Sequence, residues 1–255
     1  MRRTFVTNAI VLRRVAYGEA DWVVTLLGRD TGHISALARS ARKSTRRFAG
    51  GLGMGMAGEA KLHERPGADL MALESFEITA DRPRLAADLG KTAHTAYAVE
   101  LCDRLCPPRH PEPPIFDWLD EFLARLDAGT ARAERLRIFE LGLLQRLGIG
   151  PCLERCLSCG RNDLGDEDVR FISASGGVFC RRCAKSGDIV QGSVRQALEL
   201  LGSASLVDGE TVSLDRDTGA GCRRVVLALL REHVHGPLRS LDFIEKVSGS
   251  LSGSR

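Results

Sequence analysis

Two Cys-x-x-Cys pairs constrain this chain more than any other feature of its sequence. The first pair is Cys156 and Cys159, the second is Cys180 and Cys183, and 20 residues separate the pairs. Each pair places two thiolates in one tight turn, and two such turns supply the tetrahedral four-sulfur set of a structural Zn²⁺ ion. The sequence therefore predicts a structural zinc module over residues 152–187, with no coordination position left for a reactive water.

The same cysteines allow other interpretations. Two disulfides are disfavoured, because the first residues lack the apolar run of a secretory leader and eight cysteines in such a chain favour a reducing compartment. A single iron ion would suit the same four thiolates. Cys152 is a spare thiol that could compete for the metal, but only Cys156 makes the two-residue spacing with Cys159.

The segment between the two pairs predicts the backbone that presents the second pair. Val169–Ser173 and Val178–Phe179 are short apolar stretches on either side of Ser175-Gly176-Gly177, which is the composition of a small hairpin. Gly160 directly follows the first pair, where a turn around a metal usually needs a residue that tolerates positive φ. We therefore expect a β-hairpin inside the zinc module.

Five short strands separated by polar turns account for the first 80 residues. No helical period interrupts them, and Gly28–Gly32 has the composition of a hairpin turn. Five such strands are typical of a small closed barrel, and the oligonucleotide-binding (OB) fold fits the count. The expected strands are Thr4–Arg14, Trp22–Leu27, His33–Ala38, Ala57–His63 and Leu70–Ile78.

The connection between the third and fourth expected strands is a run of positive charge. Five of the nine residues from 39 to 47 are basic and none is acidic. Such runs are usually solvated faces, but small hydroxyl neighbours and a barrel that commonly binds single strands favour contacts with phosphates. The candidate DNA-binding residues are Arg39, Arg42, Lys43, Arg46 and Arg47. Trp22, Tyr17 and Phe48 could stack on bases, although the scarcity of aromatic residues favours a core position for each.

From Asp81 onward the apolar residues recur at helical spacing, and Asp81-Arg82-Pro83 predicts a helix start. Ser193 with Gln196 predicts a capping box at the start of a later helix. The tail Ser248–Arg255 is rich in serine and glycine, and we expect it to be disordered. The main expected helical faces are Ala93–Leu105, Phe116–Leu126, Leu136–Leu147 and Cys222–Leu230.

These patterns together predict an α+β multidomain protein. Residues 1–80 form an N-terminal OB-fold β-barrel for DNA binding, and residues 81–255 form an α-helical domain carrying the inserted four-cysteine zinc module, residues 152–187. The net charge of +3 is too small to indicate a binding partner, so the prediction of a partner rests on how the charges are distributed along the chain. No stretch approaches the roughly 18 apolar residues of a membrane span, and we expect a cytoplasmic protein.

Two motifs suggest catalysis or cofactor binding, and both fail on their context. Gly53, Gly55 and Gly58 spell G-x-G-x-x-G, but a basic loop precedes them and a strand follows, where a dinucleotide fold needs a strand and then a helix. His110-Pro111-Glu112 with Pro151-Cys152 resembles a zinc deaminase signature, but three residues rather than two follow Cys152 before the next cysteine. We therefore predict no catalytic residues and no enzymatic activity.

The order of several segments resembles the RecO family of bacterial recombination mediators, and the similarity extends over nearly the whole chain. The segments that carry it are Gly18–Asp21, Thr25–Gly32, Ala38–Lys43, Arg137–Leu144 with Leu147-Gly148, and Pro237–Ser240. The four cysteines correspond to the zinc-containing branch of that family. Ser40 departs from the family pattern, which commonly has glycine in this basic turn.

The resemblance implies an OB-fold, a helical domain and a zinc module. It further implies binding of single- and double-stranded DNA, annealing of complementary strands, and help in loading recombinase onto strands coated with single-strand DNA-binding protein. The implied partners are RecR, single-strand DNA-binding protein and, in some lineages, RecF, and the implied location is the cytoplasmic nucleoid. From the residues alone, the prediction is an OB-like barrel with a helical zinc domain that binds nucleic acid.

Three hypotheses follow from the sequence. The first is a non-enzymatic DNA-binding mediator, in which the basic run neutralises phosphates. The second is a zinc-dependent nucleic-acid enzyme, a deaminase or nuclease, which requires an open position on the metal. The third is a zinc-stabilised protein adaptor that docks a partner without binding DNA.

Overall fold

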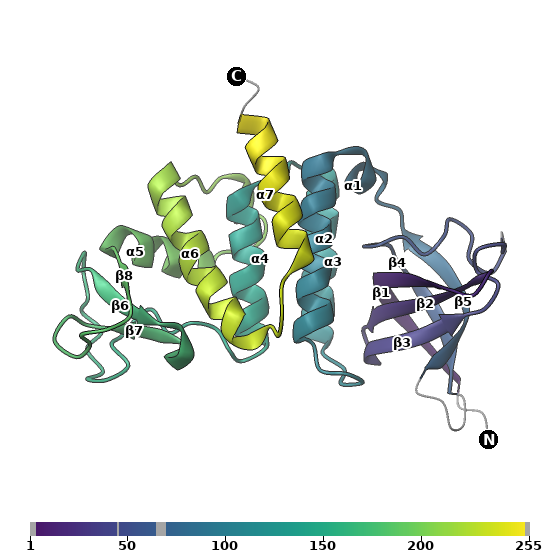
Figure 1. Ribbon diagram of the computed structural model, residues 1–255, viewed down its shortest axis with the longest axis horizontal. Helices are drawn as coiled ribbons and strands as arrows, with labels where there is room; N and C mark the ends of the chain where they lie inside the picture. The colour runs from purple at the N-terminus through teal and green to yellow at the C-terminus, as the bar shows by residue number, and fades with distance from the viewer. Residues whose placement is uncertain (1–3, 45, 65–69, 253–255) are drawn as a thin grey trace. The chain divides into compact units, whose positions relative to one another are not determined.

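The computed structural model describes residues 4–44, 46–64 and 70–252, with side chains as far as Val247 (Figure 1). The chain divides into two compact units. Unit 1 is Met1–Thr130 with Leu238–Arg255, and unit 2 is Ala131–Pro237. Each unit buries its own set of apolar side chains, and each is described separately below.

Unit 1 begins with a closed five-stranded barrel, which confirms the predicted OB-like architecture. The spatial order is β1-β2-β3-β5-β4, in which only β3 and β5 are parallel. The barrel strands are β1 (Thr4–Tyr17), β2 (Asp21–Gly28), β3 (Gly32–Ala38), β4 (Ala57–His63) and β5 (Met71–Ala80). β1 continues three residues past the predicted end at Arg14, because its last residues pair in register with the start of β2.

The barrel core includes two side chains from outside the strands. Phe48 and Leu52 lie in the connection between β3 and β4, and they are 2% and 1% exposed. They pack with inward-facing strand residues such as Val24 and Phe76. The backbone N–H of Phe76 also donates to the carbonyl oxygen of Arg47 at 3.0 Å. The connection that carries the basic run is therefore anchored to the barrel.

Within its described residues, unit 1 is completed by four helices: α1 (Pro83–Ala87), α2 (Leu89–Leu105), α3 (Pro113–Ala128) and α7 (Arg239–Ser252). Proline stands at the start of α1, as the sequence predicted. α2 contacts β1 and β2 on one side of the barrel (Figure 1).

Ion pairs join the barrel to α2 and α3. His33 Nε2 lies 2.8 Å from a carboxylate oxygen of Asp103, and the Arg29 guanidinium contacts both oxygens of Asp117 at 2.9 and 3.0 Å. Burial opposes ionisation of Asp103, but its hydrogen bond to His33 and the charge of Arg13 hold its pKa below the usual value. These pairs fix which side of the barrel faces the helices of unit 1.

The C-terminal helix α7 corrects the expectation of a disordered tail. Residues 248–252 continue α7, while residues 253–255 lie outside the described part of the chain. Ile244 and Val247 are buried, and α7 packs along α2. The Glu100 carboxylate of α2 accepts hydrogen bonds from the backbone N–H groups of Arg239 and Ser240, at 3.1 and 2.8 Å. A side chain distant in sequence therefore caps this helix, which local composition does not reveal.

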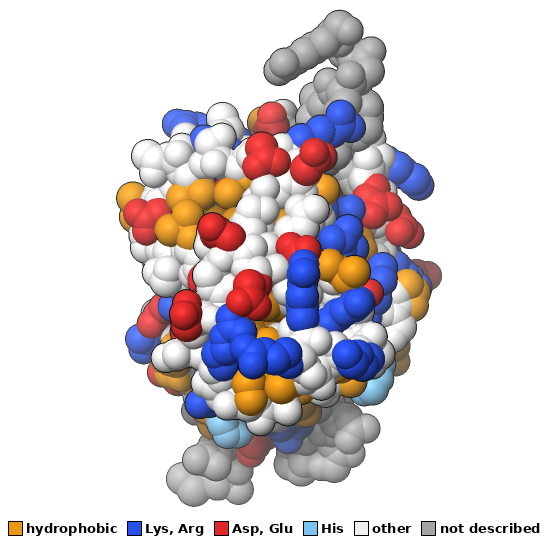
Figure 2. Space-filling view, turned by 90° about the vertical axis from the view of Figure 1, so that its left-hand side faces the viewer, with side chains coloured by type: hydrophobic (Ala, Val, Ile, Leu, Met, Phe, Trp, Pro, Cys, Tyr) orange, Lys and Arg blue, Asp and Glu red, His pale blue; other side chains and the backbone are white. Residues whose placement is uncertain are grey.

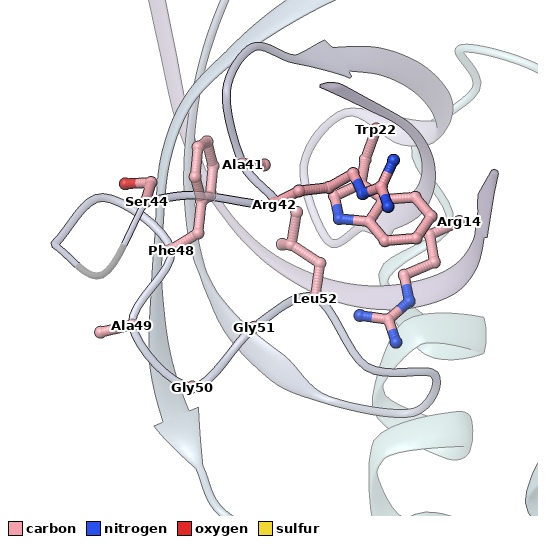
Figure 3. A pocket seen from close by; sticks show the side chains of 10 residues that line it. All are labelled: Arg14, Trp22, Ala41, Arg42, Ser44, Phe48, Ala49, Gly50, Gly51 and Leu52. Atoms are coloured by element: carbon pink, nitrogen blue, oxygen red, sulfur yellow. The ribbon is translucent and has the colours of Figure 1, made fainter. Parts of the chain in front are cut away.

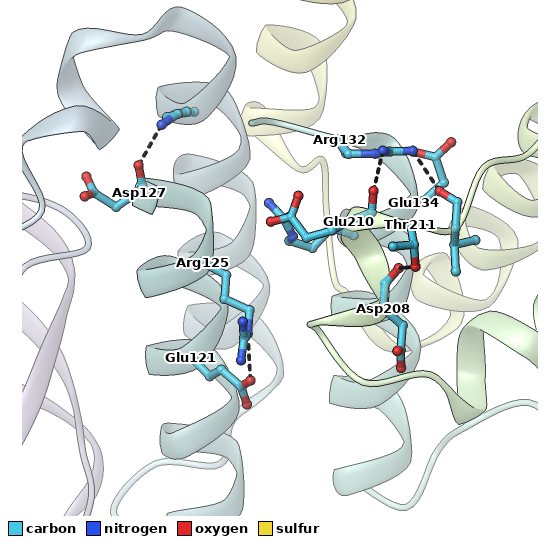
Figure 4. A network of polar contacts seen from close by, with 11 residues as sticks. Glu121, Arg125, Asp127, Arg132, Glu134, Asp208, Glu210 and Thr211 are labelled. Carbon is cyan, nitrogen blue, oxygen red and sulfur yellow. Dashed lines mark hydrogen bonds and ion pairs between the residues drawn. The ribbon is translucent and has the colours of Figure 1, made fainter. Parts of the chain in front are cut away.

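Unit 2 combines helices with a small antiparallel sheet of order β7-β6-β8. α4 packs against α5 and α6. The Arg132 guanidinium, just before α4, donates to the carbonyl oxygens of Glu210 and Val212 at 2.7 Å each (Figure 4). The elements are α4 (Ala133–Arg146), β6 (Val169–Ile172), η1 (Ser173–Ser175), β7 (Gly177–Phe179), β8 (Asp188–Val190), α5 (Gly192–Ser203), η2 (Asp208–Glu210) and α6 (Arg216–His233).

The capping box predicted at the start of α5 is wrong. Gln191 occupies the N-cap position without a side-chain hydrogen bond, and Ser193 already lies within the first turn. The Gln196 amide nitrogen instead donates to a carboxylate oxygen of Asp166 at 2.7 Å. The Gln196 side chain therefore makes a tertiary contact with the loop before β6 instead of a local capping contact.

The predicted domain boundary after residue 80 falls at the end of β5, just before α1. The compact units are delimited differently, since α1, α2, α3 and α7 belong to the same unit as the barrel. The division into a DNA-binding domain of residues 1–80 and a helical domain of residues 81–255 stays a prediction. Among the described residues, no helix has both the length and the apolarity required to cross a membrane.

Replacing Glu100 with Ala tests the contact that holds α7. We expect the free energy of unfolding to fall by about 1–2 kcal/mol, because the backbone donors at the start of α7 lose their acceptor. Urea denaturation followed by circular dichroism measures the change. Glu59→Ala, at an exposed carboxylate on β4, is the control, and equal stability of the two variants would show that the capping contact contributes nothing.

Candidate nucleic-acid interface and metal centre

All five residues of the predicted basic run are exposed on the connection between β3 and β4. The run begins with a tight turn, in which the Lys43 N–H donates to the Ser40 carbonyl at 3.1 Å. Ser40 has a φ of 54°, in the left-handed region. The Asp21 carboxylate holds this conformation by accepting the Ser40 N–H at 2.7 Å. Serine thus adopts the backbone conformation for which glycine is favoured.

The basic run lies against the turn between β1 and β2. The backbone N–H of Arg42 donates to the carbonyl oxygen of Ala20 at 3.0 Å, and its guanidinium donates to that of Glu19 at 3.1 Å. Within the run, the Arg47 guanidinium donates to the Arg39 carbonyl at 2.8 Å. Two loops therefore meet at one mouth of the barrel, and the β1–β2 loop is among the loops with which OB-folds bind oligonucleotides.

The three aromatic residues considered as stacking partners have different environments. Phe48 is a core residue, as expected, and Trp22 is half-buried against the barrel core. The expected core position of Tyr17 is wrong, because this side chain is 59% exposed. Tyr17 is the last residue of β1, where the strand extends to the hairpin turn.

A pocket of about 470 Å³ opens beside the basic run (Figure 3). The guanidinium carbons of Arg14 and Arg42 lie over the Trp22 indole, at 4.9 and 5.6 Å from the ring centroid. Sequence reasoning missed Arg14. Arg14 pairs with the buried Val24 of β2, so its side chain lies on the inner face of the barrel, at the mouth. The sequence does not specify this pairing, and therefore does not reveal where Arg14 points. The lining residues are Arg14, Trp22, Ala41, Arg42, Ser44, Phe48, Ala49, Gly50, Gly51 and Leu52.

The rejected G-x-G-x-x-G motif leads directly into β4, which confirms that it does not open a dinucleotide-binding helix. Gly50, Gly51 and Gly55 have φ values of 81°, 83° and 77°. Glycine in this segment therefore serves a strongly curved connection back into the barrel.

The structure brings the four predicted metal ligands together. The sulfur atoms of Cys156, Cys159, Cys180 and Cys183 all lie within 4.8 Å of one another, and those of Cys159 and Cys180 are 3.9 Å apart. Four Zn–S bonds of about 2.3 Å in a tetrahedron separate the sulfurs by about 3.8 Å. The donor set therefore fits Zn²⁺ or a single iron ion, and a bound ion would cross-link the two turns.

The backbone of the module supports thiolate formation. The Cys180 N–H donates to the Cys156 sulfur at 3.3 Å. Burial opposes ionisation of Cys156, but backbone N–H groups, including those of Cys159 and Cys180, outweigh it and lower the pKa to about 6. Gly160 has a φ of 73°, which confirms the expected turn.

The predicted hairpin is confirmed as β6 and β7, which pair from Arg170–Phe179 to Ile172–Gly177. A third strand, β8, which pairs with β6, was not predicted. Cys152 extends this sheet through its backbone. Its N–H donates a hydrogen bond to the Gly176 carbonyl oxygen, and its carbonyl oxygen accepts one from the Val178 N–H. Its thiol is not among the four clustered sulfurs, so Cys156 is the fourth candidate ligand.

The charge around the module is mixed rather than uniformly basic. Arg181 pairs with Asp168 at 2.7 Å, and Arg161 pairs with Glu167. Figure 2 faces the part of unit 2 that carries this module, and acidic side chains are interspersed there among Lys and Arg side chains. The four-cysteine group includes no histidine. Nδ1 of His110 instead lies 3.0 Å from a carboxylate oxygen of Glu112.

The closed barrel with a basic mouth and the helical unit with a four-cysteine module define a class of protein: OB-fold proteins with a helical second part that carries a candidate metal site. Comparison with protein families is more specific. Residues 1–82 match the family model "Recombination protein O N terminal", and residues 86–242 match "Recombination protein O C terminal". The chain therefore belongs to the RecO family.

Similar proteins in three bacteria carry the name DNA repair protein RecO. The relative from Anaeromyxobacter sp. (strain Fw109-5) is 38% identical, over 96% of this chain and 97% of its own length. The relative from Anaeromyxobacter dehalogenans (strain 2CP-C) is 36% identical, over 96% of this chain and 98% of its own length. The relative from Myxococcus xanthus (strain DK1622) is 36% identical, over 94% of this chain and 96% of its own length. The similarity extends through both units.

The conformation of Ser40 predicts a stabilising substitution. Ser40→Gly should raise the free energy of unfolding by about 0.5–1 kcal/mol, because the left-handed conformation costs a residue with a Cβ roughly 1–2 kcal/mol. Ala41→Gly, outside the left-handed region, should instead lower stability. Chemical denaturation of both variants measures the difference, and a destabilised Ser40→Gly variant would contradict the geometry of the turn.

The sulfur cluster predicts a metal that is structural. We expect a chelator to lower the thermal stability of unit 2, and Cys159→Ser to abolish stoichiometric metal binding, because a closed four-thiolate site tolerates no missing ligand. Elemental analysis and X-ray absorption should show four sulfur neighbours and distinguish zinc from iron. Cys152→Ser and Cys222→Ser are matched controls, and loss of metal in either would show that the ligand set is different.

Proposed function

We propose that this protein is a DNA-binding mediator of recombination and repair, and that the mouth of its barrel is the DNA-binding surface. The observation that carries the proposal is the placement of Arg39, Arg42, Lys43, Arg46 and Arg47, all exposed on an anchored connection beside the β1–β2 turn. The named function of its RecO relatives supports a role in DNA repair. A phosphate chain meets several guanidinium groups there, each able to bind two oxygens.

The mechanism is electrostatic and needs no catalytic group. Neutralising the phosphates of one strand lowers its repulsion of a second strand, which favours annealing of complementary single strands. The same surface can hold single- or double-stranded DNA, since phosphate contacts do not depend on base sequence. The protein is then a non-enzymatic mediator located with the DNA in the cytoplasm.

The resemblance to the RecO family supports a proposal for the remaining partners. We propose that the protein acts with RecR and with single-strand DNA-binding protein, and with RecF in lineages that use it, to load recombinase onto coated strands. The metal module contributes stability to unit 2 rather than chemistry, because four sulfur ligands leave no position for water.

Salt dependence tests the proposed surface. If all five basic residues contact single-stranded DNA, the logarithm of affinity should fall with the logarithm of salt concentration at a slope of about −0.7 per contact. Replacing Arg42, Lys43, Arg46 and Arg47 together with Ala should therefore flatten the slope by about 3 units. Fluorescence anisotropy of a labelled oligonucleotide across a salt series measures it.

The matched control removes the same charge from unit 2. It replaces Arg155, Arg182, Lys185 and Arg224, which are exposed and outside the basic run, and it should leave the slope nearly unchanged. An unaltered slope in the first variant would exclude the basic run from DNA binding. Absence of binding in the unmodified protein, with RecR still co-purifying, would favour the adaptor hypothesis.

A further inference from the structure

We propose that the pocket at the barrel mouth receives one unpaired nucleobase, which stacks against Trp22 in place of one of the two guanidinium groups that lie over its ring, while its phosphate contacts Arg14 or Arg42. This proposal deepens the proposed function and rests on it. The basic run explains attraction to any phosphate chain, but it does not explain how a single strand would be distinguished from a duplex. The pocket supplies that distinction, because only an unpaired base can leave its stack and enter.

The chemistry of the pocket suits a base. Its wall is formed largely by apolar side chains, among them Phe48 and Leu52, and by the glycine backbone of Gly50 and Gly51 along one side (Figure 3). The space beside Gly51 is open, because a Cβ built there would meet only Arg14 Nη1, at 4.0 Å, which is an ordinary van der Waals contact. Small-molecule sites are typically apolar concavities with a few placed polar groups, as here.

The two arginines supply the charged part of the site. Their guanidinium carbons lie 4.9 and 5.6 Å from the centroid of the Trp22 ring. Such cation–π contacts hold both positive charges beside the apolar pocket. A nucleotide presents the complementary pattern, a flat aromatic base joined to an anionic phosphate, and stacking on an aromatic side chain does not depend on base identity.

The arrangement of the strands explains why this site lies at the mouth. Arg14 pairs with Val24 and Ala16 pairs with Trp22 in the β1–β2 ladder, so their side chains lie on the face that turns into the barrel. Deeper in the barrel, that face is filled by buried residues such as Val24. At the rim the filling is incomplete, and the pocket of about 470 Å³ remains.

Fluorescence of Trp22 gives a direct readout. The chain has two tryptophans, and the second, Trp118, is buried in α3. In a Trp118→Phe variant of the full chain, Trp22 is the sole indole. An oligothymidylate should quench its emission on binding, whereas an abasic oligonucleotide of equal length and charge should bind on the order of 10-fold more weakly without quenching. A duplex of equal length should also leave the emission unchanged.

A matched pair of substitutions separates this pocket from other aromatic surfaces. Trp22→Leu should remove the preference for the base-containing oligonucleotide over the abasic one. Tyr17→Ala, an exposed aromatic on the same hairpin but outside the pocket lining, should retain it. The quenching measurement keeps the test valid even if Trp22→Leu folds poorly, since the reporter variant leaves the pocket intact.

The outcomes distinguish the two proposals. Equal affinity for thymidylate and abasic strands, or equal quenching by both, would overturn the base pocket while leaving the phosphate-binding surface in place. Loss of base preference in Tyr17→Ala rather than Trp22→Leu would also overturn it. Failure of every oligonucleotide to bind at low salt would overturn the proposed function itself, and the pocket with it.

Discussion

Burial of Phe48 and Leu52 inside the barrel is the interaction on which the candidate interface depends. Each side chain, fully removed from water, contributes about 2–3 kcal/mol of hydrophobic stabilisation. The basic run immediately precedes them, so this burial fixes one end of the run, while the end of β3 fixes the other. A connection rich in arginine and glycine would otherwise remain extended in solution through charge repulsion and backbone entropy. The barrel core therefore sets the position of the cations as well as its own stability.

Anchoring leaves the charged groups themselves free to contact a ligand. The backbone of the turn is held by the Asp21 carboxylate and by the Ala20 carbonyl, while the five basic side chains are exposed. Arg42 and Arg47 use some of their donors on backbone carbonyls, yet each guanidinium has five N–H donors and keeps others for phosphate. A fixed backbone that carries exposed cationic groups suits a ligand whose phosphates recur along a chain.

Features governed by local chemistry could be predicted from the sequence. Alternation and turn composition located the five barrel strands, with Ala57–His63 matching in full, and spacing alone identified the four clustered cysteines. Features governed by distant partners could not. The N-terminus of α7 depends on a hydrogen bond to Glu100, which is distant in the sequence. The serine- and glycine-rich composition of the tail gives no sign of this contact. Arg14 joins the site only through strand register, which one sequence does not specify.

The metal module illustrates the same division between local and tertiary stabilisation. Strands β6, β7 and β8 contain four, three and three residues. Sheets this small bury too little apolar surface to be stable alone, although Phe171 and Val178 are buried within the module. Exposed ion pairs such as that between Arg181 and Asp168 add little to the stability of the module. A metal ion bound by the four clustered thiolates would cross-link the two turns and so supply the stability that the short strands lack.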